Sequence, residues 1–265
     1  MRDSKKTENT VKKCLWCRLD ETETTFNKKA HTIPKSLGGQ NYNQTVCDNC
    51  NHFFGNATSE NRYSIETALK ETFCITRQRF LSGKTQKRQV GKFKSIFFDV
   101  KDRNGKLRLT LNKSFLFKSE FQQKLCRSFK RGLMKMWLEE FDRQSKNNIG
   151  HNEKFETIRQ FSRYDIGNIP VIYFERRIGL FIFTKCEAET PILMLNRMKY
   201  LYENEKFTEI EFLGHVFGFP ITQFTKEDFD IYIKNSMEIK TQFFTNAILL
   251  DKLIDIDFTL KIIDK

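Results

Sequence analysis

The spacing of apolar residues predicts two helices in the first part of the chain. Ile65, Leu69 and Phe73 recur at helical intervals, which predicts an amphipathic helix over 59–82. A longer apolar stripe predicts a second helix over 119–143. The stripe consists of Phe121, Leu125, Phe129, Leu133, Met136, Trp137 and Phe141. A stripe of this kind is usually buried, so we expect the long helix to lie in the core.

The pattern of apolar and polar residues also predicts strands. Residues 92–101 and 107–111 alternate on either side of the pair Asn104-Gly105, which is typical of a β-hairpin. In the second part of the chain, the predicted strands cover 171–174, 179–184, 192–195 and 210–219. The resulting fold class is α+β, with an antiparallel sheet packed by the long helix.

Aromatic residues supply much of the volume available for a core. The chain has 27 phenylalanines. Phe217, Phe219 and Phe224 could either fill the core or stack on unpaired bases. Stacking requires an exposed ring, so we expect these three side chains to lie in the core.

The charge of the chain favours a polyanionic partner. Lys and Arg number 46 against 33 Asp and Glu, which gives a formal charge of +13 and a pI of about 9.4. Residues 77–94 contain seven basic residues and no acidic one. The candidate nucleic-acid-binding residues are Lys35, Arg77, Arg79, Lys84, Lys87 and Arg88. Contacts of this type position a nucleic acid without specifying its bases.

Four of the seven cysteines form two Cys-x-x-Cys pairs, which is the spacing of a zinc site. The pairs are Cys14 with Cys17 and Cys47 with Cys50. Because four thiolates fill a tetrahedral coordination sphere, the predicted zinc ion is structural. The chemistry of the protein must therefore fall to other residues near the pairs.

The remaining cysteines and the apolar stretches indicate the compartment. Cys74, Cys126 and Cys186 are an odd number in apolar or amphipathic stretches, so a disulfide framework is not expected. Residues 1–13 lack the apolar run of a signal peptide. The longest apolar stretch, 169–184, is interrupted by charged residues, so no membrane span is expected. We therefore predict a cytoplasmic protein.

The segment between and after the cysteine pairs resembles a known family. Residues 31–34 read His-Thr-Ile-Pro, a Gly-Gly pair follows at 38–39, and residues 47–55 read Cys-Asp-Asn-Cys-Asn-His-Phe-Phe-Gly. This order resembles the HNH endonucleases, in the branch with His-x-Ile-Pro, Gly-Gly and Cys-x-x-Cys-Asn. The resemblance implies a ββα-metal fold in which two strands and a helix, stapled by zinc, present a histidine and a divalent ion to a phosphodiester.

The resemblance also implies the roles of individual residues. His31 corresponds to the general base and Asn51 to a ligand of the catalytic ion, Mg²⁺ or Mn²⁺. Asn43, with Asn41 as the alternative, corresponds to the asparagine that orients the histidine loop. An imidazole suits the base because its unperturbed pKa lies near neutrality, and an amide oxygen suits a hard cation. Pro34 and the Gly-Gly pair are expected to form a tight loop that holds His31.

One position departs from the family pattern. Ala30 stands where most relatives have an acidic ligand of the catalytic ion. Three interpretations stay open: the site works with Asn51 alone, His52 or Asp48 supplies the missing contact, or activity has been lost. Asn51 could alternatively cap a helix that starts near residue 53.

Two further histidines are not expected to be catalytic. His151 lies in a polar turn and His215 in an apolar strand. Neither belongs to the segment that resembles the nuclease family.

The length of the chain predicts two domains. We expect a zinc-stapled HNH module at 1–58 and an α+β domain at 59–265 for targeting, dimerisation or docking of a regulatory partner. The predicted function is a metal-dependent DNA endonuclease, in the context of restriction or defence against phage. Two alternatives remain: a non-catalytic zinc protein that binds nucleic acid, and a nuclease directed at RNA.

Overall fold

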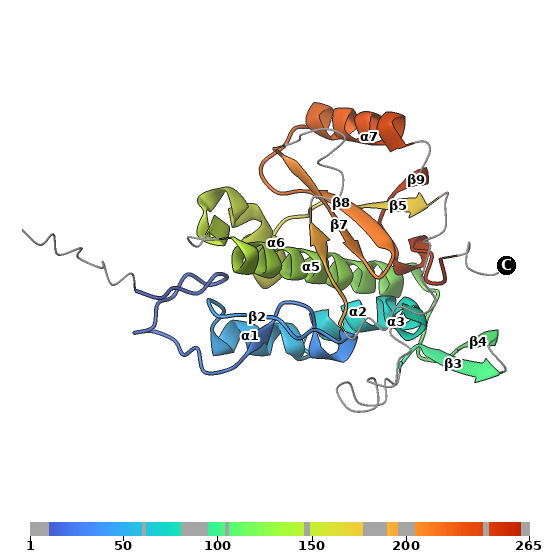
Figure 1. Ribbon diagram of the computed structural model, residues 1–265, viewed down its shortest axis with the longest axis horizontal. Helices are drawn as coiled ribbons and strands as arrows, with labels where there is room; N and C mark the ends of the chain where they lie inside the picture. The colour runs from blue at the N-terminus through green and yellow to red at the C-terminus, as the bar shows by residue number, and fades with distance from the viewer. Residues whose placement is uncertain are drawn as a thin grey trace, which may run out of the picture.

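A long central helix separates the two parts of the molecule. The computed structural model describes residues 11–59, 62–80, 95–103, 106–145, 149–176, 190–195, 205–240 and 244–260. Helix α5 (Ser119–Gln144) runs across the middle, with the N-terminal elements on one side and an antiparallel sheet on the other (Figure 1). The predicted α+β class is therefore confirmed, and α5 matches the helix predicted over 119–143 to within one residue.

The N-terminal part contains a small ββα unit. Strands β1 (Ala30–His31) and β2 (Tyr42–Asn43) are antiparallel, with Ala30 opposite Asn43 and His31 opposite Tyr42. The short 3-10 helix η1 (Lys35–Leu37) lies in the connection between them. Helix α1 (Asp48–Gly55) follows, so the predicted order of two strands and a helix is present.

The helix predicted over 59–82 is two shorter helices in the structure. Helix α2 (Ile65–Thr72) begins after Ser64, whose side chain accepts a hydrogen bond from the Thr67 N–H. Helix α3 (Cys74–Phe80) follows after a break at residue 73. The predicted helix was too long because α2 begins only after its N-cap at Ser64 and ends at the break before α3. Residues 81 and 82 of the prediction lie outside the described part of the chain.

The predicted hairpin is confirmed. Strands β3 (Phe98–Arg103) and β4 (Lys106–Leu111) are antiparallel and in register from end to end. Residues 92–94 of the prediction lie outside the described residues. After α5 come the 3-10 helices η2 (Ile149–His151) and η3 (Glu153–Phe155), and then helix α6 (Glu156–Tyr164).

The sheet has five strands in the order β6-β7-β8-β5-β9, and all neighbours are antiparallel. The strands are β5 (Ile172–Arg176), β6 (Met194–Leu195), β7 (Phe207–Phe212), β8 (His215–Pro220) and β9 (Phe244–Leu249). The strand predicted at 171–174 is thus confirmed as β5, and of the strand predicted at 192–195 the last two residues form β6. The strand predicted at 179–184 lies outside the described residues.

The single strand predicted over 210–219 was wrong, because the chain reverses within it. Leu213 and Gly214 have φ values of 45° and 87° and join β7 to β8 as a hairpin. Two positive φ angles are typical of the tight turns that connect such strands, and the glycine adopts this conformation readily. Helix α7 (Lys226–Lys240), strand β9 and the 3-10 helix η4 (Leu253–Asp255) were not predicted from the sequence.

Buried residues connect both parts of the molecule. One cluster of buried apolar side chains extends from Cys14 to Ile256 and includes Leu133 of α5. Phe217 and Phe219 are fully buried, as predicted, while the half-buried Phe224 packs against Phe207 at 5.7 Å between ring centroids. The domain division at residue 58 stays a prediction. Among the described helices, none combines the length and the apolar composition needed to cross a bilayer.

Candidate functional site

The four predicted zinc ligands converge on one point. The sulfur atoms of Cys14, Cys17, Cys47 and Cys50 all lie within 4.8 Å of one another, and those of Cys17 and Cys47 are 3.7 Å apart. A tetrahedral zinc ion with Zn–S bonds of about 2.3 Å requires sulfurs about 3.8 Å apart. The cluster therefore suits a structural zinc ion.

Backbone conformation brings each pair of sulfurs together. After Cys17 the chain reverses at Arg18, which has a φ of 66°, and the Cys14 N–H donates to the Leu19 carbonyl at 2.8 Å. In the second pair, Cys47 is the N-cap of α1 and its sulfur accepts a hydrogen bond from the Cys50 N–H. The Cys47 N–H in turn donates to the Cys14 sulfur at 3.4 Å.

Charges around the sulfurs favour a cation. Hydrogen bonds from the Cys14 and Cys50 thiols lower the pKa of Cys17 to about 4, whereas the same network raises the pKa of Cys50. Four thiolates this close together would repel one another, so they need a cation between them. Arg163, which was not identified from the sequence, donates from Nε to the Cys50 sulfur at 3.4 Å. Donors of this kind stabilise metal-bound thiolates.

A tight loop holds His31, as predicted. Gly38 has a φ of 100° and its N–H donates to the Lys35 carbonyl at 3.0 Å. A Cβ atom on Gly39 would lie 1.9 Å from the Ile33 carbonyl oxygen, so only glycine fits there. The loop therefore brings Gly39 directly against the backbone of Ile33, two residues after the histidine.

The environment of His31 keeps its imidazole neutral. Burial lowers the pKa of His31, and the Lys35 and Lys135 ammonium groups lower it further, against an opposing hydrogen bond with the Lys29 backbone and the charge of Glu66. The half-buried ring is thus unprotonated at neutral pH and can accept a proton.

Asn43 fastens the hairpin to α5. Its buried side chain donates from Nδ2 to the Glu139 carbonyl at 3.0 Å and to Asp142 Oδ2 at 2.9 Å, and its Oδ1 accepts from the Thr45 N–H at 2.7 Å. The side chain of the other candidate, Asn41, is exposed, and its backbone carbonyl accepts from the Thr32 N–H. These contacts give Asn43 a positioning role and leave its predicted influence on the histidine loop as a prediction.

Three other polar contacts between the motif and α5 were not foreseen. Trp16 Nε1 donates to Glu139 Oε1 at 2.9 Å, and Thr32 Oγ1 donates to Glu140 Oε2 at 2.8 Å. Lys135 Nζ donates to the His31 carbonyl at 2.8 Å. Charged residues inside the apolar pattern of the long helix were the signal in the sequence that could have revealed this attachment.

Lys135 and Glu139 form a fully buried ion pair. The Lys135 ammonium and Glu139 Oε2 are 3.0 Å apart. Burial raises the pKa of Glu139 to about 7, against the opposing charge of Lys135. Burial works to lower the pKa of Lys135, but the carboxylates of Glu139 and Glu66 outweigh it and the pKa is raised. Lys135 is therefore a permanent positive charge behind the hairpin.

The structure gives the surroundings of three residues in α1 that were considered as ligands of the catalytic ion. Asn51 lies inside the helix, half-buried, and Cys47 is the N-cap, so the interpretation of Asn51 as the cap was wrong. The Asp48 carboxylate already accepts hydrogen bonds from Thr25 Oγ1 at 2.6 Å and the Lys28 N–H at 2.7 Å. His52 is exposed, and its Nδ1 lies 3.1 Å from Asn56 Nδ2.

The candidate phosphate-binding residues differ in their placement. Lys35 is exposed and close enough to His31 to influence its pKa. Arg77 is 2% exposed, which argues against direct contact of its guanidinium with phosphates. Arg79 lies in α3. Lys84, Lys87 and Arg88 lie outside the described residues.

The histidines expected to be non-catalytic lie away from solvent. His215 is fully buried and packs against Phe73. His151 is partly buried, and its Nδ1 lies 3.2 Å from Arg18 NH1, next to the first cysteine pair.

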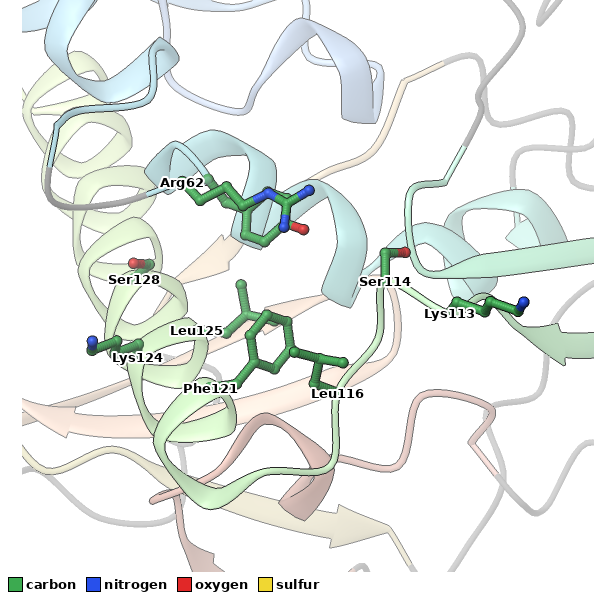
Figure 2. Close-up of a pocket in the computed structure, with 9 residues that line it drawn as sticks. Arg62, Lys113, Ser114, Leu116, Phe121, Lys124, Leu125 and Ser128 are labelled. Atoms are coloured by element: carbon green, nitrogen blue, oxygen red, sulfur yellow. The ribbon is translucent and has the colours of Figure 1, made fainter.

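A hollow of about 310 Å³ lies between α5 and the segments that precede α2 and α5 (Figure 2). Three exposed cations, Arg62, Lys113 and Lys124, stand at its walls, and Phe121 and Leu125 form an apolar floor. The combination suits an anion with an apolar body.

The geometry defines a ββα unit stapled by a four-sulfur centre, with an imidazole on its first strand. Residues 14–62 match the family model of the HNH endonucleases, which confirms the resemblance in the N-terminal part of the chain. No curated protein and no solved structure matches the chain. At the level of the family, the match supports a nuclease-type function on a nucleic-acid substrate.

Proposed function

We propose that the protein is a metal-dependent endonuclease that hydrolyses phosphodiester bonds of DNA. In this proposal His31 is the general base, Asn51 is a ligand of a catalytic Mg²⁺ or Mn²⁺ ion, and the four cysteines hold a structural zinc ion. The observation that carries it is the conjunction, within the segment that matches the HNH family, of four sulfurs within 4.8 Å and a histidine on β1.

The residues present support this chemistry. A neutral imidazole can take the proton from an attacking water molecule, and burial and nearby ammonium groups favour the neutral form of His31. The carboxamide of Asn51 offers an oxygen of the kind that hard cations bind. Such an ion, when bound, neutralises charge that grows on the phosphate oxygens and the leaving 3′ oxygen. Hydrolysis would leave a 5′ phosphate and a 3′ hydroxyl.

Charge supports a polyanionic substrate. The formal charge of +13 and the exposed Lys35 near His31 favour a phosphate backbone. In the same proposal, the part of the chain beyond the matched segment serves targeting, dimerisation or docking of a regulatory partner, as a restriction or anti-phage effector would require.

Plasmid nicking tests the proposal. Zinc-loaded protein is incubated with supercoiled plasmid and Mg²⁺ or Mn²⁺, beside His31→Ala and His52→Ala. We expect nicking by the wild type and His52→Ala and its loss in His31→Ala. Equal nicking by all three would show a contaminant, and binding without nicking by the wild type would favour the non-catalytic alternative. Parallel digestion of duplex DNA, single strands and RNA identifies the substrate.

A further inference from the structure

The proposed catalytic site lacks a negative charge among the residues assigned so far. His31 and Asn51 are neutral, and a divalent cation in proteins is usually held by one or two carboxylates. Position 30 is a fully buried alanine, and Asp48 is already held by the Thr25 hydroxyl and two backbone N–H groups. A carboxylate from another element is therefore needed to balance the ion.

Glu66, in the first turn of α2, reaches the end of α1. Its Oε2 lies 3.9 Å from the point where a Cβ atom of Gly55 would stand. Because Gly55 has no side chain, the space between this carboxylate and the helix remains open. Asn51 lies four residues earlier on the same face of α1, about 6 Å away between Cβ positions.

Glu66 also faces the strand that carries His31. The Lys135 ammonium lies 3.4 Å from Glu66 Oε1 and donates to the His31 carbonyl at 2.8 Å, so one cation contacts both residues. The same ammonium lies 5.7 Å from the ring centre of Phe54 in α1. The three elements β1, α1 and α2 therefore meet around Lys135.

The Glu66 carboxylate is accessible to an ion. Lys135 is closer to Glu139, at 3.0 Å, and this pair is fully buried. The Glu66 side chain is 26% exposed, so a hydrated cation can approach this carboxylate from solvent. Lys135 thus divides its contacts between two carboxylates, and Glu66 is the one of the two that solvent reaches.

We propose that Glu66 supplies the carboxylate ligand of the catalytic ion, opposite Asn51 and beside His31. This inference rests on the proposed nuclease function and deepens it. Glu66 lies beyond residue 62, where the family match ends, so α2 completes a site that the matched segment leaves without an acidic ligand.

Metal binding by the full chain tests the inference directly. Zinc-loaded wild type, Glu66→Gln and Glu66→Asp are titrated with Mn²⁺ in the absence of DNA, and free Mn²⁺ is measured by electron paramagnetic resonance. The matched control is Glu238→Gln, which removes the same charge from an exposed site on α7. We expect Glu66→Gln to bind Mn²⁺ roughly tenfold or more weakly, Glu66→Asp to lose less, and Glu238→Gln to match the wild type.

Nicking of plasmid by the same proteins separates the two proposals. Activity of Glu66→Gln should return as Mn²⁺ is raised, whereas activity of His31→Ala should not. Nicking by the wild type together with unchanged Mn²⁺ affinity in Glu66→Gln would overturn the role of Glu66 and leave the nuclease function standing. A wild type that neither binds Mn²⁺ nor nicks DNA would overturn both.

A measurement on the wild type covers the case in which Glu66→Gln does not fold. Fe²⁺ replaces Mg²⁺ in the zinc-loaded protein, and ascorbate with peroxide then cuts the polypeptide next to the bound iron. We expect cuts near residues 31, 51 and 66, located by mass spectrometry. Cuts at the first two positions without one near residue 66 would contradict the inference.

Discussion

The N-terminal unit and the C-terminal sheet are stabilised in different ways. Strands β1 and β2 have two residues each and α1 has eight, whereas β7 and β8 have six residues each and every one of them is buried. Aromatic rings pack on the sheet: the ring centroid of Phe217 lies 5.3 Å from that of Tyr173 and 5.4 Å from that of Phe129. The N-terminal unit instead has a cluster of four cysteine sulfurs and polar contacts with α5.

This difference shows how a small ββα unit can be made rigid. Short strands and one short helix bury too little apolar surface to order a loop by themselves. The cysteine cluster, with a zinc ion bound, would fix one side of the hairpin, and hydrogen bonds from Asn43 and Thr32 to α5 fix the other. The sheet side supports α5 and thereby supports the hairpin.

Removal of zinc should have the largest effect and should separate the two regions. Structural zinc contributes about 10 kcal/mol or more to the folding of small zinc modules. In Cys47→Ser we expect amides of residues 11–55 to lose protection in hydrogen exchange while β7 and β8 keep theirs. Equal loss of protection in both regions would show that they unfold as one unit.

Phe217→Ala tests the contribution of the C-terminal sheet to stability. The ring is fully buried between Phe129 of α5 and Tyr173 of β5, so its removal should lower the free energy of unfolding by about 3–5 kcal/mol. The measurement is chemical denaturation, with zinc content as a check that the sulfur site is intact. Phe117→Ala, at a ring that is 66% exposed, serves as control and should change little.

Asn43→Ala should have a smaller effect, concentrated at the junction with α5. The substitution removes the Asn43 hydrogen bonds to Asp142 Oδ2 and to the Glu139 carbonyl and takes the Asn43 acceptor away from the Thr45 N–H, at a cost of about 1–3 kcal/mol. Asn41→Ala is the matched control, because its side chain is exposed. Denaturation and nicking should both respond to the first change and not to the second; the reverse result would make Asn41 the residue that orients the loop.

The dependence of nicking on pH should show the smallest effect. His31 acts as a base only when neutral, and its pKa is lowered from 6.5, mainly by burial. We therefore expect the rate to stay level as pH falls to about 6.5 and to decline by about tenfold per pH unit only below the lowered pKa. A decline that begins above pH 6.5 would show that the imidazole is not in the environment described.

Local patterns predicted the elements that depend on local signals. The β3–β4 hairpin, the apolar stripe of α5 and the convergence of the cysteines each follow from a few neighbouring residues, and each is present in the structure. The β7–β8 hairpin was missed because apolar residues continue on both sides of Gly214 and Leu213 itself is apolar, although both residues form the turn. A single glycine between two apolar runs is too weak a signal to predict a turn from the sequence.

Contacts between distant residues were beyond reach of the sequence. Glu139 meets Trp16 across 123 positions, and Lys135 meets the His31 carbonyl across 104. Nothing in the spacing of residues 59–82 distinguishes Glu66 from the other polar residues of an amphipathic helix. Its position opposite α1 arises only when α2 packs on α5.

The most direct test of the proposed chemistry is the single-turnover rate of DNA cleavage by wild type and His31→Ala at equal zinc content and saturating Mn²⁺. We expect the substitution to slow cleavage by at least about 10²-fold, as removal of a general base does, with zinc bound in both proteins. Equal rates in the two purified proteins would contradict the assignment of His31 as the base and with it the proposed function.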